Sequence, residues 1–191
     1  NHLAVANFAQ IAKNKKIKLI HISTDYVFDG STHKPYLETD TPNPQSVYGK
    51  TKLDGELAMQ QINPVNSIIT RTSWVYSKFG NNFVKTMLRL AESRDEISVV
   101  TDQIGSPTNA ADLANAILKI LPKICNETVE IFHYSNEGVC SWYDFANVIF
   151  EIKEIAVKVN PIESKLYPTP AERPFYSVLN KEKIKEYYQV E

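Results

Sequence analysis

Tyr48 and Lys52 are the residues of this chain whose types and spacing point most directly to chemistry. They lie four positions apart in Tyr48-Gly-Lys-Thr-Lys52, so a helix through this segment would place both side chains on one face. An ammonium group beside a phenol favours the phenolate, and it is expected to lower the pKa of Tyr48 from about 10 toward the range of an acid–base catalyst. The alternative is a solvated helix face, which the spacing alone does not exclude.

Further polar groups follow the two strands predicted on either side of this helix. The apolar segment Ile17–Ile22 runs into Ser23-Thr24-Asp25, and Ser67–Thr72 runs into Ser73-Trp74. Ligands of an open α/β sheet bind beyond the carboxyl ends of its strands, and a right-handed crossover brings the start of the connecting helix close to both ends. We therefore expect one pocket to collect Thr24, Asp25, Tyr48, Lys52 and Trp74.

This set of side chains suits redox chemistry at a carbonyl group, because the carbonyl oxygen needs a proton as hydride reaches the carbon. It does not suit acyl transfer, since no Ser/His/Asp arrangement is in sight. Two simpler interpretations stay open at this point. Thr24-Asp25 could be only a turn that ends a strand, and Trp74 could be only a packing anchor.

The pattern along the chain predicts alternating helices and strands, and hence a mainly parallel sheet. Val5, Phe8, Ala9 and Ala12 form one apolar helical stripe, and Leu3 and Ile11 add apolar surface as in a helix buried on two sides. Asn43-Pro44 is expected to cap the helix that carries Tyr48 and runs to about Gln61. Other helices are predicted at 82–93, 110–121, 141–153 and 181–188, with strands or extended pieces at 97–100, 129–134 and 157–162.

Composition places the chain among globular proteins and excludes several classes of partner. Of its 191 residues 43% are hydrophobic and 23% are charged, and the formal net charge of -1 gives no reason to expect nucleic acid or an anionic membrane. No apolar run approaches the roughly 20 residues that span a bilayer, and no signal peptide opens the chain. Cys125 and Cys140 are expected to be reduced cysteines of a cytoplasmic protein, and the four histidines lack zinc-ligand spacing.

Five blocks of sequence, taken together, resemble dTDP-4-dehydrorhamnose reductase, an extended short-chain dehydrogenase/reductase. They occur in the family's order, and the resemblance runs from the first residue to nearly the last, although each block alone is a weak signal. The blocks are Ser23-Thr-Asp-Tyr-Val-Phe-Asp-Gly30, Tyr48-Gly-Lys-Thr-Lys52, Arg71-Thr-Ser-Trp-Val-Tyr76, Asp102-Gln-Ile-Gly-Ser-Pro-Thr108 and Arg173-Pro-Phe-Tyr-Ser177.

The resemblance implies a role for each candidate residue. Tyr48 would be the acid that protonates the C4 oxygen of the sugar, Lys52 would bind the nicotinamide ribose, and Thr24 would bind the substrate carbonyl. Tyr48, Lys52 and Ser23 would contact the cofactor, NADPH or NADH. Substrate contacts would come from Thr24, Asp25, Trp74 and Arg173.

The resemblance also implies a Rossmann-like fold with a small α/β lobe for the nucleotide sugar. Residues 1–100 would be the C-terminal part of an NAD(P)-binding domain, and residues 101–191 mainly the substrate lobe, with a strand or helix able to return to the sheet. The family's Gly-rich phosphate loop has no counterpart among the six glycines, so this stretch is expected to bind cofactor poorly or not at all alone and to leave a sheet edge uncovered.

The implied function is reduction of dTDP-4-dehydro-6-deoxy-L-mannose to dTDP-L-rhamnose, a step toward cell-surface polysaccharide. Two alternatives stay open: a non-catalytic subunit resembling the regulatory subunit of methionine adenosyltransferase, and another nucleotide-sugar epimerase or dehydratase. The choice between NADH and NADPH, a homodimer, and the Mg²⁺ used by some members of the family are left open, and no carboxylate cluster in the sequence demands the metal.

Overall fold

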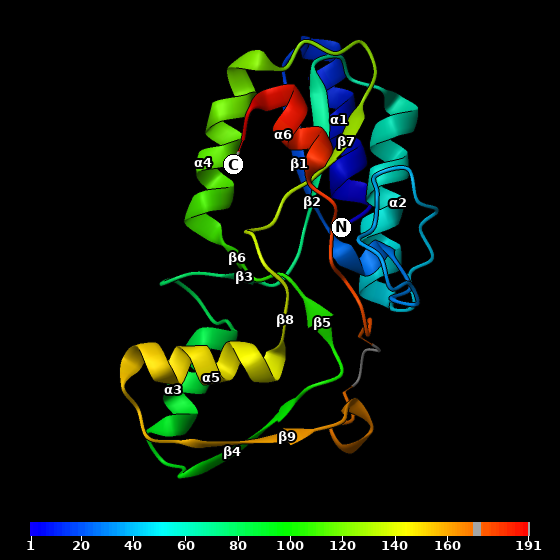
Figure 1. Cartoon of the computed structure of the whole chain (residues 1–191). Helices are drawn as coiled ribbons and strands as arrows, with labels where there is room; N and C mark the ends of the chain where they lie inside the picture. The colour runs from blue at the N-terminus through cyan, green and yellow to red at the C-terminus, as the bar shows by residue number, and fades with distance from the viewer. Residues whose placement is uncertain (170–172, 191) are drawn as a thin grey trace.

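The computed structural model describes residues 1–169 and 173–190, which form two lobes (Figure 1). The upper lobe in Figure 1 contains the main sheet, whose strands β1 (Leu19–Thr24), β2 (Ser67–Thr72) and β7 (Glu130–His133) are parallel in the order β1-β2-β7. Thr24 pairs with Thr72, so β1 and β2 end side by side. The groups that follow these two strands are therefore brought to one edge of the sheet.

Helices cover both faces of the main sheet. Helices α1 (Leu3–Lys15) and α2 (Val47–Ile62) pack on one face, where Ile69 meets Met59. Helices α4 (Ala110–Ile120) and α6 (Glu182–Tyr188) cover the other face, where Ile68 meets Leu113, Phe132 and Ile184. Ile68 and Ile69 are consecutive and point to opposite faces, as strand geometry requires. This arrangement confirms the predicted doubly wound, mainly parallel α/β fold.

The lower lobe is a two-stranded parallel sheet covered by two helices. Strand β4 (Glu96–Val100) pairs with β9 (Lys158–Ile162), and α3 (Phe83–Ala91) and α5 (Trp142–Lys153) pack on them through a core that includes Met87, Ile97, Ile149 and Val159. Elements from both sides of residue 100 enter this lobe, and β7, α4 and α6 return to the upper one. The division of function between residues 1–100 and 101–191 stays a prediction.

Short elements join the lobes and escape prediction because two residues show no periodicity. Strand β3 (Val75–Tyr76) pairs with β6 (Thr108–Asn109), and β5 (Ile104–Gly105) pairs antiparallel with β8 (Cys140–Ser141). The 3-10 turns are η1 (Asp25–Val27), η2 (Leu121–Lys123) and η3 (Ser164–Leu166).

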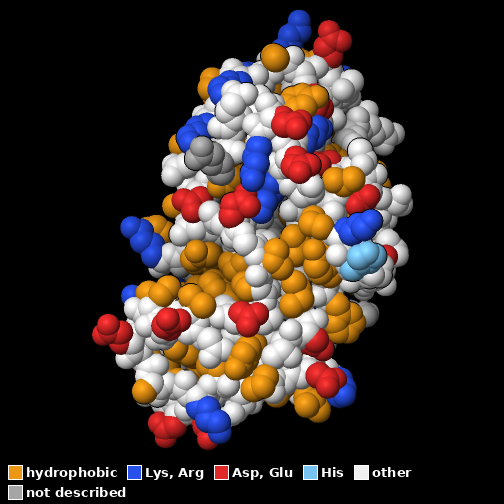
Figure 2. Space-filling model, viewed as in Figure 1, with side chains coloured by type: hydrophobic (Ala, Val, Ile, Leu, Met, Phe, Trp, Pro, Cys, Tyr) orange, Lys and Arg blue, Asp and Glu red, His pale blue; other side chains and the backbone are white. Residues whose placement is uncertain are grey.

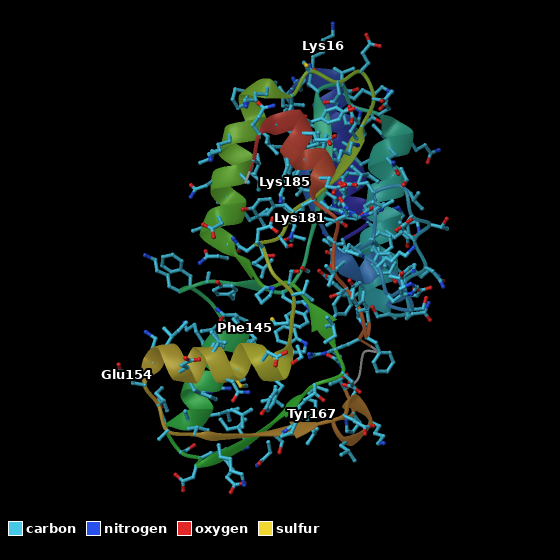
Figure 3. The ribbon with its side chains drawn as sticks, in the orientation of Figure 1. Lys16, Phe145, Glu154, Tyr167, Lys181 and Lys185 are labelled. Atoms are coloured by element: carbon cyan, nitrogen blue, oxygen red, sulfur yellow. The ribbon has the colours of Figure 1, made fainter. Side chains whose placement is uncertain are left out.

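Hydrophobic side chains gather across the middle of the face shown in Figure 2. Phe145 of α5, labelled in Figure 3, contacts Tyr76 of β3 with ring centroids 5.5 Å apart.

Two local predictions are wrong. The cap of α2 is Ser46, whose hydroxyl accepts a hydrogen bond from the Gly49 N–H at 3.1 Å, while Asn43 instead donates its side-chain amide to Asp29. Helix α1 buries Val5, Ala9 and Ala12, but Phe8, Leu3 and Ile11 are exposed rather than packed. The buried face of α1 is therefore narrower than the predicted apolar stripe and excludes Phe8. An apolar side chain at helical spacing does not by itself show burial. No described helix is both long enough and apolar enough to cross a bilayer.

Candidate active site

A pocket of about 770 Å³ lies at the carboxyl ends of β1 and β2, where the upper lobe meets the lower one. Its wall includes every residue that the sequence singled out as a candidate: Ser23, Thr24, Asp25, Tyr48, Lys52, Trp74 and Arg173. The structure therefore brings together groups that are up to 150 positions apart in the chain. Lining the same pocket does not by itself show what each side chain does, so the contacts of each one are described in turn.

Thr24 and Asp25 mark the point where β1 turns into η1. The Thr24 hydroxyl accepts the Tyr26 N–H at 3.3 Å, which caps this turn, and donates to Oδ1 of Asp25 at 2.9 Å. Both side chains are buried, and Oδ2 of Asp25 has no hydrogen-bond partner. Burial raises the pKa of this carboxyl to about 6. The turn interpretation and the pocket interpretation both hold, since the residues that end the strand also line the cavity.

Tyr48 lies in the first turn of α2, and its phenol is held at the pocket wall. Its side chain meets the Tyr26 ring edge to face, with centroids 5.6 Å apart and planes at 77°. With 47% of its surface exposed, Tyr48 is open to a ligand in the pocket and does not lie in the core. A phenol placed in this way can donate a proton to an oxygen atom bound beside it.

Lys52 lies one turn further along α2 and is mostly buried. Its ammonium donates a hydrogen bond to the Ile22 carbonyl oxygen of β1, and Nε2 of His21 lies 3.5 Å away. Burial lowers the pKa of Lys52, and burial together with the nearby Lys52 charge lowers the pKa of His21 to about 4. His21 is therefore neutral near pH 7. Its Nε2 can accept a hydrogen bond from the Lys52 ammonium, which keeps its positive charge.

The expected effect of Lys52 on Tyr48 is not what this structure shows. Burial raises the pKa of Tyr48 above its usual value, the Thr24 hydroxyl lowers it through a hydrogen bond, and the Asp25 charge raises it. Lys52 is absent from these causes because its ammonium is turned to the Ile22 carbonyl at the end of β1. In this state the phenol keeps its proton at neutral pH, which is the form an acid needs.

The indole of Trp74 forms the wall of the pocket on the side of the lower lobe. It stacks on Trp142 with ring centroids 3.5 Å apart and planes 8° apart, and Phe83 packs on Trp142 at 4.5 Å. Gly105 makes room for the indole, since a Cβ there would come within 2.5 Å of it. Trp74 itself has a φ of 48°, an unusual value for a bulky residue. Such strain near a cavity is typical of functional sites.

Sequence reasoning missed several residues of the pocket wall. Tyr26 lay inside a recognised block without being assigned a position, and Trp142 carried only the signal of a helix start. Tyr167, labelled in Figure 3, follows η3 in a stretch that predicts only a loop. The complete wall as described adds Ile22, Tyr26, Thr72, Val75, Phe83, Thr86, Met87, Ser98, Val99, Val100, Trp142 and Tyr167.

The pocket offers groups that fit a nicotinamide ribose. Tyr48 and Lys52 are neighbours on one helical face, and Oγ of Ser23 is buried without a hydrogen-bond partner. The hydroxyl groups of a ribose can form hydrogen bonds with the Tyr48 phenol and the Lys52 ammonium. Within residues 1–169 and 173–190, no group of three His, Cys, Asp or Glu side chains could hold a metal ion.

Comparison with known proteins identifies the family. The family model described as "RmlD substrate binding domain" matches residues 1–191, the whole chain. The protein described as dTDP-4-dehydrorhamnose reductase from Sinorhizobium fredii is 44% identical over 100% of this chain and 67% of its own length. The chain belongs to the dTDP-4-dehydrorhamnose reductase family. The resemblance predicted from the five sequence blocks, and with it membership of an oxidoreductase family, is confirmed.

Other members of the reductase family agree in sequence and in fold. The reductase from Escherichia coli K12 is 42% identical over 97% of this chain and 64% of its own length. A crystal structure of the reductase from Bacillus anthracis in complex with NADP matches with a TM-score of 0.92 and 41% identity, covering 97% of this chain and 65% of that one. The chain thus spans about two thirds of the length of these relatives.

Proposed function

We propose that this protein reduces the C4 keto group of dTDP-4-dehydrorhamnose (dTDP-4-dehydro-6-deoxy-L-mannose) to give dTDP-L-rhamnose, using NADPH or NADH. The observation that carries the proposal is the meeting of Tyr48, Lys52 and Thr24 in one pocket. The reductase relatives support the substrate, and the NADP complex of one relative supports the cofactor. The product would enter the synthesis of cell-surface polysaccharide.

Each of these side chains has a distinct task in the proposed reaction. The reduced nicotinamide, when bound, supplies the hydride. Tyr48 donates its proton to the C4 oxygen as negative charge develops there, and Thr24 turns its hydroxyl from Oδ1 of Asp25 to donate a hydrogen bond to the same oxygen. Lys52 binds the ribose, and its ammonium must leave the Ile22 carbonyl to stabilise the phenolate that Tyr48 becomes. Ser23 adds a polar contact to the cofactor.

The substrate would be held from the other side of the pocket. We assign Asp25 and Trp74 to the deoxysugar because both line the pocket, and the Trp74 indole offers the sugar an apolar face. Arg173 offers a cation to the nucleotide diphosphate. In this proposal the elements within 1–100 that carry Tyr48 and Lys52 serve the cofactor, and 101–191 mainly serve the nucleotide sugar.

The direct test is to supply the intact protein with dTDP-4-dehydrorhamnose and NADPH and to identify the product by NMR. We expect one equivalent of NADPH to be oxidised for each dTDP-L-rhamnose formed. An epimerase or dehydratase would return the hydride to its substrate and consume no NADPH overall. A methionine adenosyltransferase regulatory subunit would show no turnover and would co-purify with a synthetase in equal amounts. Either result would reject the reductase function.

Location and assembly are proposed at a coarser level. Cys125 and Cys140 are both unpaired, as in proteins of reducing compartments, and we place the reaction in the cytoplasm. Homodimer formation stays a prediction.

A further inference from the structure

The segment Arg173–Ser177, here called the strap, runs from the lower lobe toward α6 beside the loop that follows η1 (Figure 1). Backbone hydrogen bonds fix one side of the strap to β5. The Ile104 N–H donates to the Phe175 carbonyl at 2.7 Å, and the Ser177 N–H donates to the Ile104 carbonyl at 2.8 Å. The strap therefore has a defined position before any ligand is present.

Gly30 touches the other side of the strap. It has a φ of 77°, and a Cβ on it would lie 2.5 Å from Cβ and 2.7 Å from Cα of Pro174, and 2.9 Å from the Phe175 nitrogen. Two of these three atoms belong to the backbone and cannot swing aside as a flexible side chain would. Any side chain at position 30 must therefore displace the strap or the turn that carries Gly30.

The turn that carries Gly30 is itself tightly held. The Gly30 N–H donates to the Tyr36 hydroxyl at 2.9 Å, and this hydroxyl donates to Asp29 at 2.9 Å. Asp29 also accepts the Asn43 amide at 3.1 Å, and the Tyr36 ring stacks on Phe28 with centroids 4.1 Å apart. Because these contacts hold the turn in place, the clash caused by a Cβ at position 30 would be relieved mainly by a shift of the strap.

Arg173 is the first residue of the strap and the one that lines the pocket. Arg173 and Tyr26 both line this pocket, and the Arg173 charge lowers the pKa of Tyr26 while burial and Asp25 raise it. The other cation of the pocket wall, Lys52, is bound to the Ile22 carbonyl at the end of β1. Arg173 is therefore the group placed to meet a ligand's negative charge on the side of the strap.

We propose that Gly30 is a positioning residue for nucleoside diphosphate binding. Because Gly30 has no side chain, Pro174 can approach it closely. This contact holds the neighbouring residue Arg173 in the position from which its guanidinium binds the diphosphate. The inference rests on the proposed function for the identity of the anion and extends it to a residue outside the pocket wall. Gly30 is not one of the residues described in the pocket wall, so in this proposal its effect reaches the ligand through Arg173.

The test measures the binding of dTDP and of thymidine to the intact protein by quenching of tryptophan fluorescence. Both tryptophans, Trp74 and Trp142, line the pocket, so the signal reports this site. Arg173→Ala should weaken dTDP binding by about 10- to 100-fold, the effect of losing a charge-assisted hydrogen bond. Gly30→Ala should weaken it by about 5- to 30-fold. Neither change should move thymidine affinity by more than about twofold, since thymidine carries no phosphate.

Gly80→Ala is the matched control. Gly80 also has a positive φ, 65°, but a Cβ there would meet no atom within 4 Å. It repeats the backbone strain of Gly30→Ala without the contact, and it should leave dTDP affinity within about twofold. In the double variant Gly30→Ala/Arg173→Ala, the loss should equal that of Arg173→Ala alone, because a residue that acts only through Arg173 has no effect once Arg173 is gone.

Tyr36→Phe keeps the test decisive if Gly30→Ala does not fold. It removes the hydroxyl that joins Gly30 to Asp29 and keeps the ring stack on Phe28. We therefore expect dTDP affinity to fall by about two- to fivefold. The same substitution should have no effect on dTDP affinity in a protein that already carries Arg173→Ala. Equal losses for dTDP and thymidine, additive losses in a double variant, or an equal loss in Gly80→Ala would overturn the inference. If dTDP follows the expected pattern but NADPH is not oxidised, the reductase function is wrong and the role of Gly30 stands.

Discussion

The Trp74 indole lies so close to Gly105 that a Cβ atom on this glycine would come within 2.5 Å of the ring. The other face of the indole has its own constraint, because Trp142 stacks on Trp74 at 3.5 Å. A strand of two residues, β5, thus fixes an aromatic wall of the pocket from one side, and α5 fixes it from the other. The position of the indole is therefore set by close contacts with Gly105 and Trp142.

Gly105→Ala should push the indole of Trp74 out of its stack. We expect a red shift of tryptophan emission, a loss of stability of about 1–3 kcal/mol from overpacking, and a KM for the nucleotide sugar raised more than kcat is lowered. Gly138→Ala is the control for the emission spectrum, since a Cβ there meets nothing within 4 Å; its φ of 91° makes the alanine strained, so its stability is expected to fall without a change in emission. An unchanged emission spectrum in Gly105→Ala would show that the stack does not depend on this glycine.

Glu56→Ala should destabilise the upper lobe strongly. Its carboxylate receives Nε and Nη2 of Arg71 at 2.6–3.2 Å, and both side chains are buried behind the pocket. Removing one partner leaves a buried charge without its counterion, which costs about 3–5 kcal/mol. Urea unfolding measures the change.

Glu163→Ala provides the comparison for the buried pair. Glu163 forms an ion pair with Lys165 at 2.6 Å, but both side chains are exposed. Water and salt screen an exposed pair, so little change in the free energy of unfolding is expected. Similar losses in Glu56→Ala and Glu163→Ala would contradict the importance assigned to burial.

Asp25→Asn should make the protein more stable at high pH. Burial raises the folded-state pKa of Asp25 to about 6, above the usual 3.8. Below the pKa of Asp25 in the unfolded chain, the carboxyl is protonated in both states and costs the folded protein nothing. This stability is lost as the pH rises through about 6, because the buried carboxyl then becomes charged in the folded state. At about pH 8 we expect Asp25→Asn to gain on the order of 2–3 kcal/mol over wild type, and near pH 4 almost nothing. Unfolding curves at several pH values test this, and a gain independent of pH would reject the cause given.

Much of the fold and of the site could be predicted from the sequence because the signals are local. The helix over Val47–Ile62 and the strand Ser67–Thr72 show apolar periodicity or β-branched runs, and the polar residues after the strands follow from the rule for parallel sheets. Membership of the family came from blocks of residues in order. Nothing in these signals requires three-dimensional information.

The parts that could not be predicted depend on long-range contacts. Lys52 turns to the Ile22 carbonyl rather than to the Tyr48 phenol, and only the distance between α2 and β1 decides between them. Strand β5 has two residues and gains its pairing from β8 and from the strap. Phe8 has helical spacing but lies on the exposed side of α1, because burial depends on what packs against the helix.

The most direct test of the account is the turnover of Tyr48→Phe in the intact protein, with dTDP-4-dehydrorhamnose and NADPH as substrates. The variant loses only the phenolic hydroxyl, and with it the proton to be donated, so we predict that kcat falls by about 10²–10⁴-fold while dTDP affinity stays within about twofold. Tyr187→Phe, on the exposed surface of α6, should keep wild-type turnover. If Tyr48→Phe keeps more than about a tenth of wild-type kcat, Tyr48 is not the proton donor and the proposed mechanism is wrong.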